Sequence, residues 1–142
     1  MGNGLKLTIE AKQWIDKAEA DFVAANRLIK HRRKPNYDLV CFCSHQCAEK
    51  YLKGFLTAAN KRFEYKHQLE KLILPLCLEV NPSFEFIREL VRRLDAYSVD
   101  FRYPGHNTDR KEALLAVQTA HAVREFVREK LPIEKPQRKD RR

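Results

Sequence analysis

Apolar side chains recur at three- and four-residue steps through most of this 142-residue chain, and this spacing constrains its fold more than any other feature. Such steps place side chains on one face of an α-helix. No segment shows the alternation that is typical of a β-strand, and only four glycines are available to interrupt helices. We therefore expect an all-α protein.

Capping residues and prolines divide this pattern into five helices. Thr8, Asn36 and Asp109 can each cap a helix start, and Asn81-Pro82-Ser83 is a further start signal. Pro75 lacks an N–H donor and is expected to kink or stop the third helix. The expected helices cover about residues 8–34, 37–60, 67–74, 83–97 and 109–131. Their short connections predict an antiparallel up-and-down four-helix bundle with one additional short helix.

The chain length fits a single domain, which we place at residues 1–134, followed by a basic, disordered tail at 135–142. The second expected helix carries apolar residues away from its main stripe: Leu39, Phe42, Cys43 and Leu56. These residues predict a second buried face, which a homodimer packed through helices would provide.

The net charge of +9 favours polyanionic partners such as RNA. The tail contributes five basic residues against one acidic residue, so the folded part is only mildly basic, and plain solvation is the alternative explanation. No apolar run approaches the roughly 20 residues that cross a bilayer. Because the first residues also lack the apolar core of a signal peptide, we expect a cytoplasmic protein without membrane contact.

Three of the four cysteines, Cys41, Cys43 and Cys47, fall within one expected helix, and Cys77 lies further along. Their spacing does not match a zinc site, although His45 nearby leaves a metal site as an alternative. We interpret the cysteines as small buried hydrophobic residues in a reducing compartment, and expect no metal and no cofactor.

The turn Arg102-Tyr103-Pro104-Gly105-His106 is the strongest candidate for chemistry. Arginine binds phosphate through a permanently charged fork, and histidine can transfer protons near neutral pH. Tyr103 could stack on a base. The structural alternative is that Arg102 pairs with Asp95 or Asp100 while His106 caps the turn.

Several motifs occur in an order that resembles the HEPN domain family (higher eukaryotes and prokaryotes nucleotide-binding). The main one is the segment from Tyr37 to Lys53, which contains His45-Gln46-Cys47-Ala48-Glu49-Lys50. The others are Ala18-x-x-Asp21-Phe22, His67-Gln68-Leu69, Leu94-Asp95-x-Tyr97 and Arg102-Tyr103-Pro104, the last of which resembles an RYP-containing subgroup.

The resemblance implies a dimeric helical bundle in which two Arg-x-His motifs face each other in a cleft. Many relatives are metal-independent endoribonucleases, often toxins paired with a minimal nucleotidyltransferase antitoxin, and others bind nucleotides or RNA without cutting. Carried over, Arg102 would hold the scissile phosphate and His106 would be the general base or acid. The spacing here is one residue shorter than the usual range.

Three further residues are candidates for binding nucleotide or RNA. Lys50 and Lys53 could line a phosphate cleft, although a solvated Glu49–Lys53 ion pair is the alternative. His67 stands at an expected helix start, where exposed N–H groups favour anions, or has only a local role there. Two other functions remain open: a non-catalytic module that binds nucleotides or a nucleotidyltransferase partner, and a purely structural dimerisation bundle.

Overall fold

The computed structural model describes residues 4–65, 67–98 and 107–133. The turn 102–106 and the basic tail therefore lie outside the described residues. Within them, every regular element is helical: α1 (Ile9–Leu28), α2 (Tyr37–Ala58), η1 (Leu69–Ile73), α3 (Leu74–Val80), η2 (Pro82–Ile87), α4 (Arg88–Leu94), η3 (Asp95–Tyr97) and α5 (Arg110–Lys130). The expected fold class is confirmed.

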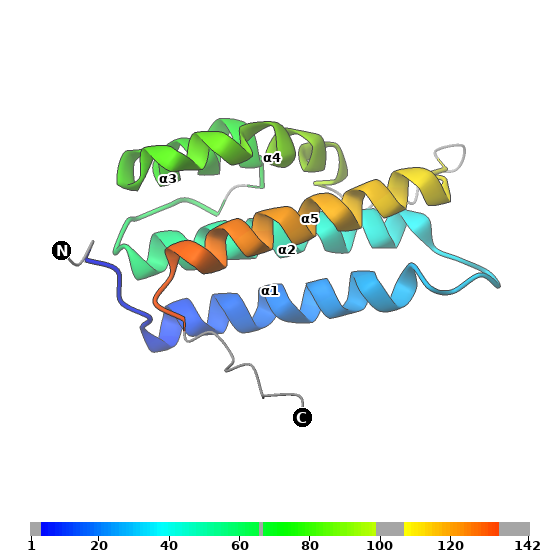
Figure 1. Cartoon of the computed structure of the whole chain (residues 1–142), viewed down its shortest axis with the longest axis horizontal. Coiled ribbons are helices and arrows are strands. Elements are labelled where there is room, and N and C mark those ends of the chain that lie inside the picture. The colour runs from blue at the N-terminus through cyan, green and yellow to red at the C-terminus, as the bar shows by residue number, and fades with distance from the viewer. Residues whose placement is uncertain (1–3, 66, 99–106, 134–142) are drawn as a thin grey trace, which may run out of the picture.

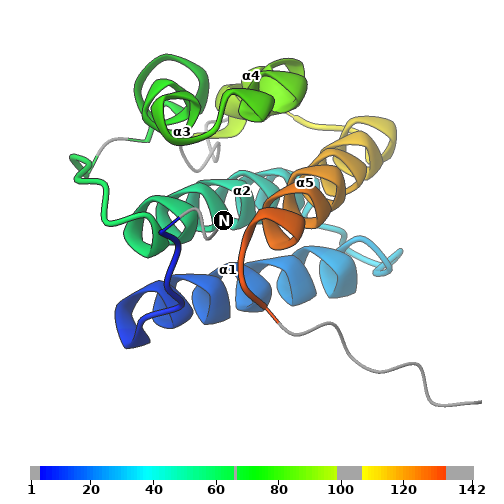
Figure 2. The same ribbon diagram turned by 60° about the vertical axis from the view of Figure 1, so that its left-hand side comes forward.

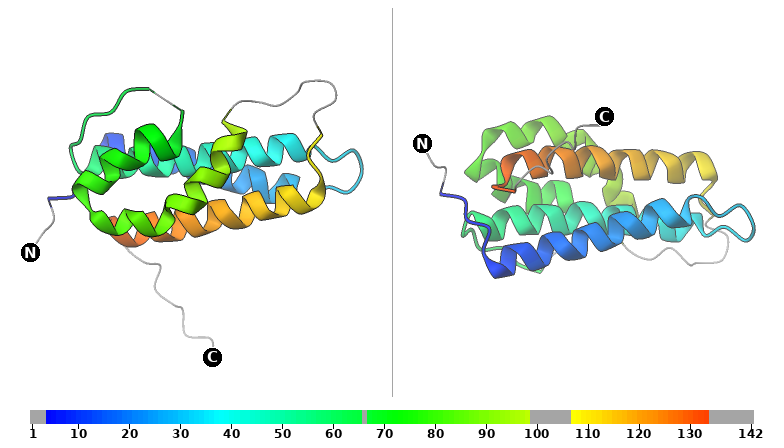
Figure 3. Two further views of the ribbon diagram at one scale, coloured as in Figure 1. Left: turned by 90° about the horizontal axis from the view of Figure 1, so that it is seen from above. Right: turned by 60° about the horizontal axis from the view of Figure 1, so that its bottom comes forward.

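The helices form two layers (Figures 1 and 2). The larger layer contains α1, α2 and α5, with α1 on one side of the other two helices. Helices α3 and α4 form the smaller layer, which covers α2 and α5 on the side opposite α1. In chain order α1, α2, α4 and α5 alternate in direction, as expected of an up-and-down bundle, and α3 is the additional short helix. Viewed from above, α2 and α5 both begin at the end opposite the N-terminus (Figure 3).

Three of the predicted helix starts are formed as expected. Thr8 Oγ1 accepts a hydrogen bond from the N–H of Ala11, and the Asn36 side chain accepts one from Leu39. Asp109 caps α5 by accepting from the N–H of Glu112 at 2.8 Å. These bonds satisfy helix N–H groups that have no partner within the helix.

Two predicted helix ends are wrong. Helix α1 ends at Leu28, six residues before Lys34. The reason is that Ile29 is the last residue before α2 whose side chain is buried in the core. The chain also continues through Pro75, which occupies the first turn of α3 after the single π-helical turn of η1. Proline is tolerated there because first-turn N–H groups have no partner within the helix.

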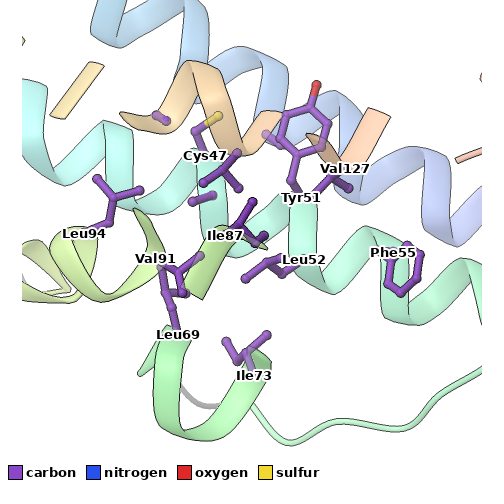
Figure 4. Packing of buried hydrophobic residues seen from close by; sticks show 14 of the residues in the cluster. Cys47, Tyr51, Leu52, Phe55, Leu69, Ile73, Ile87, Val91, Leu94 and Val127 are labelled. Atoms are coloured by element: carbon purple, nitrogen blue, oxygen red, sulfur yellow. The ribbon is translucent and has the colours of Figure 1, made fainter. Parts of the chain in front are cut away.

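Helix α2 is the centre of the core. Of the residues predicted to form its second buried face, Cys43 and Leu56 are buried, whereas Leu39 and Phe42 are half-buried. Leu52 is fully buried and faces Leu69, Ile73 and Val91 of the smaller layer (Figure 4). The smaller layer therefore buries Leu52, which belongs to the main apolar stripe of α2. Cys41, Cys43, Cys47 and Cys77 are all buried, which confirms that they act as small core residues.

Candidate functional site

Segment 99–106, which carries the predicted catalytic pair, is followed closely by a residue that is hydrogen-bonded to α2. The backbone N–H of Thr108 donates to Oδ1 of Asp38 at 3.1 Å. Thr108 is half-buried, and Asp109 begins α5 directly after it. The exit of the segment is thus joined to the start of α2.

Two residues before segment 99–106, Asp95 and Tyr97, are also held by hydrogen bonds to other elements. Both carboxylate oxygens of Asp95 accept backbone hydrogen bonds from η1, at 2.6 Å from Leu69 and 3.0 Å from Glu70. The Tyr97 hydroxyl donates to Glu112 of α5, and burial raises the pKa of Tyr97. Two elements distant in sequence therefore fix the entry to the segment.

The three residues predicted within this segment are Arg102, Tyr103 and His106, and all three lie outside the described residues. Of the ion-pair partners considered for Arg102, Asp100 also lies outside them. Asp95 is described, and it uses both oxygens to hold the start of η1.

A strip of polar residues on α2, which we call the α2 polar strip, consists of His45, Glu49 and Lys53. Four-residue spacing places them on one helix face, and all three are buried, at 0%, 3% and 2% exposure. The end of the connection before η1 lies against this face: His45 Nε2 donates to the backbone oxygen of His67 at 3.1 Å. The strip therefore holds this connection against α2.

Lys53 is more enclosed than a solvated ion pair would be, so that interpretation of Glu49–Lys53 is wrong. Lys53 Nζ donates to Glu49 Oε2 at 3.0 Å. The ammonium also lies between 5.5 and 5.9 Å from the ring centres of Trp14, Phe63 and Tyr65. Aromatic faces attract a desolvated cation, so this box stabilises the buried charge. With 2% exposure, Lys53 does not present its ammonium to a phosphate in this arrangement.

His67 shares Glu49 with Lys53. Its Nδ1 donates to Glu49 Oε1 at 2.9 Å, while 62% of its side chain is exposed. The structure thus brings together two of the predicted binding residues, one buried and one exposed. Helix η1 begins two residues later, at Leu69, so His67 is not the first residue of that helix.

Lys50 belongs to a different cluster, on the side of α2 that faces α1. Its ammonium lies 2.5 Å from the Asp21 carboxylate and is about one-fifth exposed. Nearby, Glu19 accepts from the Arg124 guanidinium at 2.6 and 2.7 Å, and these hydrogen bonds lower the pKa of Glu19. This cluster ties α1 to α2 and α5.

Helix geometry separates Lys50 and Lys53 from the anchored segment within one chain. Lys53 follows Asp38 by fifteen residues, or roughly 22 Å along the axis at about 1.5 Å per residue. Lys50 lies roughly 18 Å away by the same measure. The two lysines therefore lie well along α2 from the start of α5.

The residues that hold the segment were not among those predicted. Asp38, Thr108 and Glu112 gave no signal of this role, because their contacts join parts of the chain that are far apart in sequence. Asp38 and Asp95 lay within segments that resemble family motifs, but those motifs did not indicate an anchoring role. Among the described residues, no group of three or more His, Cys, Asp or Glu side chains is arranged to hold a metal ion, and no helix is long and apolar enough to cross a membrane.

The described helices and the anchored connection define an all-α bundle with a candidate site between η3 and α5. The model of the HEPN domain matches residues 11–130, which is most of the chain. The chain therefore belongs to the HEPN domain family.

Two solved structures resemble it closely in fold. TT1696 from Thermus thermophilus is 27% identical, with a TM-score of 0.70 over 87% of this chain and 100% of that one. ST0689, described as an archaeal HEPN homologue, is 24% identical, with a TM-score of 0.66 over 84% of this chain and 96% of that one. No match to a curated protein was found.

Proposed function

We propose that this HEPN protein acts on RNA as a metal-independent endoribonuclease, with Arg102 and His106 as its catalytic residues. The observation that carries the proposal is the anchoring of both flanks of segment 99–106, by Asp95 on one side and by the Asp38–Thr108 bond on the other. Catalytic groups work best on connections positioned by a rigid scaffold. Membership of the HEPN family supports the same assignment.

The chemistry follows from the two side chains. Arg102 holds the scissile phosphate through paired hydrogen bonds, while His106 takes the proton of the 2′-hydroxyl. The 2′-oxygen then bonds to phosphorus, the bond to the 5′-oxygen breaks, and a second imidazole protonates the leaving oxygen. In a homodimer the second copy supplies that imidazole. The products are a 2′,3′-cyclic phosphate and a 5′-hydroxyl.

The remaining predicted residues take supporting roles in this proposal. Tyr103 stacks on a base beside the scissile phosphate. His67, being exposed, contacts the RNA, while Lys53 acts from inside by holding Glu49 in place for His67. Lys50 reaches RNA only by exchanging its contact with Asp21.

The biological setting follows from the sequence motif. We propose that Arg102-Tyr103-Pro104 marks the chain as a member of the RYP-containing subgroup, and that it is the toxin half of a two-component module whose partner is a minimal nucleotidyltransferase. A reading frame for such an enzyme beside the gene supports this setting, and an unrelated neighbour argues against it.

Incubation of the purified protein with RNA in EDTA tests the activity. Cleavage should persist in chelator and disappear in Arg102→Ala and His106→Ala. Matched controls are Arg92→Ala and His121→Ala, which remove an exposed arginine and an exposed histidine elsewhere and should cut like wild type. Cleavage that survives loss of Arg102 and His106 would contradict the proposal.

A surface hollow favours a second candidate, a non-catalytic nucleotide-binding or nucleotidyltransferase-partner module. The hollow measures about 540 Å³, within the range of small-ligand sites, and its walls include Arg62, Phe63 and Tyr65. An aromatic ring and a cation together suit a base and a phosphate. Calorimetric titration with ATP would show binding that Tyr65→Ala weakens, together with intact RNA.

A further inference from the structure

The connection between α1 and α2 carries five consecutive basic residues: Lys30, His31, Arg32, Arg33 and Lys34. All five are exposed. None of them forms an ion pair or a side-chain hydrogen bond within the part of the chain that the structure describes. Several arginines elsewhere are paired, as Arg88 is with Glu70 and Glu85. The charge of this connection is therefore not used to hold the fold together.

The start of α5 adds two more cations, Arg110 and Lys111. The N-terminal end of a helix carries partial positive charge, so cations there are electrostatically unfavourable. The Arg110 guanidinium Nε is also buried without a hydrogen-bond partner. Local helix stability thus gives no reason for these two residues.

Both groups lie at one end of the bundle, where the connection after α1 and the beginning of α5 are seen together (Figures 1 and 3). Lys34 precedes Asp38 by four residues, which span at most about 14 Å. Asp38 in turn holds Thr108, two residues before Arg110. We call residues 30–34 together with Arg110 and Lys111 the basic end.

We propose that the basic end binds the phosphate backbone of RNA on both sides of the nucleotide that is cut. This inference rests on the proposed function, because the segment with Arg102 and His106 leads into α5 at this end. Exposed cations without internal partners can neutralise phosphates without breaking an existing ion pair, and each such contact releases counterions. Phosphate contacts carry no sequence information, so this surface positions RNA without selecting its bases.

The test measures how binding depends on salt, with an unstructured 2′-O-methyl oligoribonucleotide that cannot be cut because it lacks the 2′-hydroxyl. The variant Arg32→Gln/Arg33→Gln/Lys34→Gln neutralises the connection. Because each phosphate contact with a single strand contributes about 0.7 to the slope of log K against log salt, the variant should lower that slope by about 2. It should also bind at least about tenfold more weakly at low salt.

The matched control is Lys12→Gln/Lys17→Gln/Lys71→Gln, which removes the same charge from exposed positions outside the basic end. It should keep the wild-type slope. The proposal is overturned if the connection variant also keeps that slope, or if the control loses as much.

Cleavage of unmodified RNA tests the proposed nuclease function independently of this binding assay. If the connection variant shows the expected change in slope but wild type does not cut RNA, the proposal for the basic end is supported and the proposed nuclease activity is contradicted. If wild type cuts RNA but the connection variant binds the oligonucleotide like wild type, only the proposed role of the basic end is contradicted. Failure of wild type to bind the oligonucleotide contradicts both.

Discussion

The backbone N–H of Thr108 donates to the Asp38 carboxylate at 3.1 Å, and this bond joins the start of α5 to the start of α2. Replacing Asp38 with alanine removes the acceptor and a negative charge from the first turn of α2. We expect Asp38→Ala to lower the free energy of unfolding by about 1–2 kcal/mol. The same variant should cut RNA more slowly, since the exit of segment 99–106 is no longer held.

Asp38→Asn is the matched control for that variant, because its amide oxygen can still accept from Thr108. Urea unfolding and RNA cleavage should both lie between those of wild type and Asp38→Ala. Equal stability of wild type and the alanine variant would show that the bond does not anchor α5.

The buried ion pair between Glu49 and Lys53 predicts a large stability effect. Lys53→Met keeps most of the side-chain volume but leaves the Glu49 carboxylate buried with His67 alone, which should cost about 3–5 kcal/mol. Lys50→Met, whose partner Asp21 is partly exposed, should cost no more than about 1 kcal/mol. Chemical denaturation of both variants measures the difference.

A double variant separates charge from packing at this pair. Glu49→Gln/Lys53→Met removes both charges, so it should recover a large part of the stability that Lys53→Met loses. If the double variant loses more free energy of unfolding than Glu49→Gln and Lys53→Met lose together, an unpaired buried charge is not the cause.

His45 predicts a dependence of stability on pH. Burial lowers the pKa of His45 below its ordinary value of 6.5, so the unfolded chain takes up a proton before the folded one. Its contribution to stability is complete above pH 6.5 and is lost as the pH falls below that value. Because glutamine can still donate to the His67 carbonyl but does not titrate, His45→Gln should lose less stability than wild type between pH 7.5 and 5.

Thermal unfolding of both proteins across this range measures the effect, with the difference between them isolating His45 from other titrating groups. Parallel stability curves would mean that His45 is not the group responsible.

Gly54 of α2 lies against Ile15 and Trp14 of α1. A β-carbon there would lie 2.6 Å from Ile15 Cδ1 and 3.3 Å from Trp14 Cβ. Alanine favours a helix over glycine by about 1 kcal/mol, but overpacking of a core contact typically costs about 1–3 kcal/mol. We expect Gly54→Ala to destabilise the protein.

Ile15→Val supplies the test of that cause, because it deletes the Cδ1 atom that would clash. Gly54→Ala should be better tolerated in the Ile15→Val background than in wild type, as judged by urea unfolding. If Gly54→Ala lowers the stability equally in both backgrounds, a clash with Ile15 Cδ1 is not the cause.

The helix starts could be predicted from the sequence because a cap is a local contact. Thr8, Asn36 and Asp109 each bond to an N–H three residues later. The end of α1 was misplaced because Pro35 is the first residue that must stop a helix, whereas the apolar residues already end at Ile29 and resume only at Tyr37. A helix without residues to bury gains little from tertiary packing.

The environment of the candidate site could not be predicted in the same way. Glu49 and Lys53 have the spacing of a surface ion pair, and Trp14 of α1 together with the connection carrying Phe63 and Tyr65 encloses them. Asp95 bonds to residues 25 and 26 positions away. Such contacts depend on how the helices pack, which a single sequence does not specify.

The decisive experiment incubates an RNA and its 2′-O-methyl counterpart in EDTA with wild type and with His106→Ala, and then determines the masses of the products. We expect fragments ending in a 2′,3′-cyclic phosphate from the unmodified RNA with wild type only. Intact RNA in every reaction, or cutting of the 2′-O-methyl strand, would contradict this expectation.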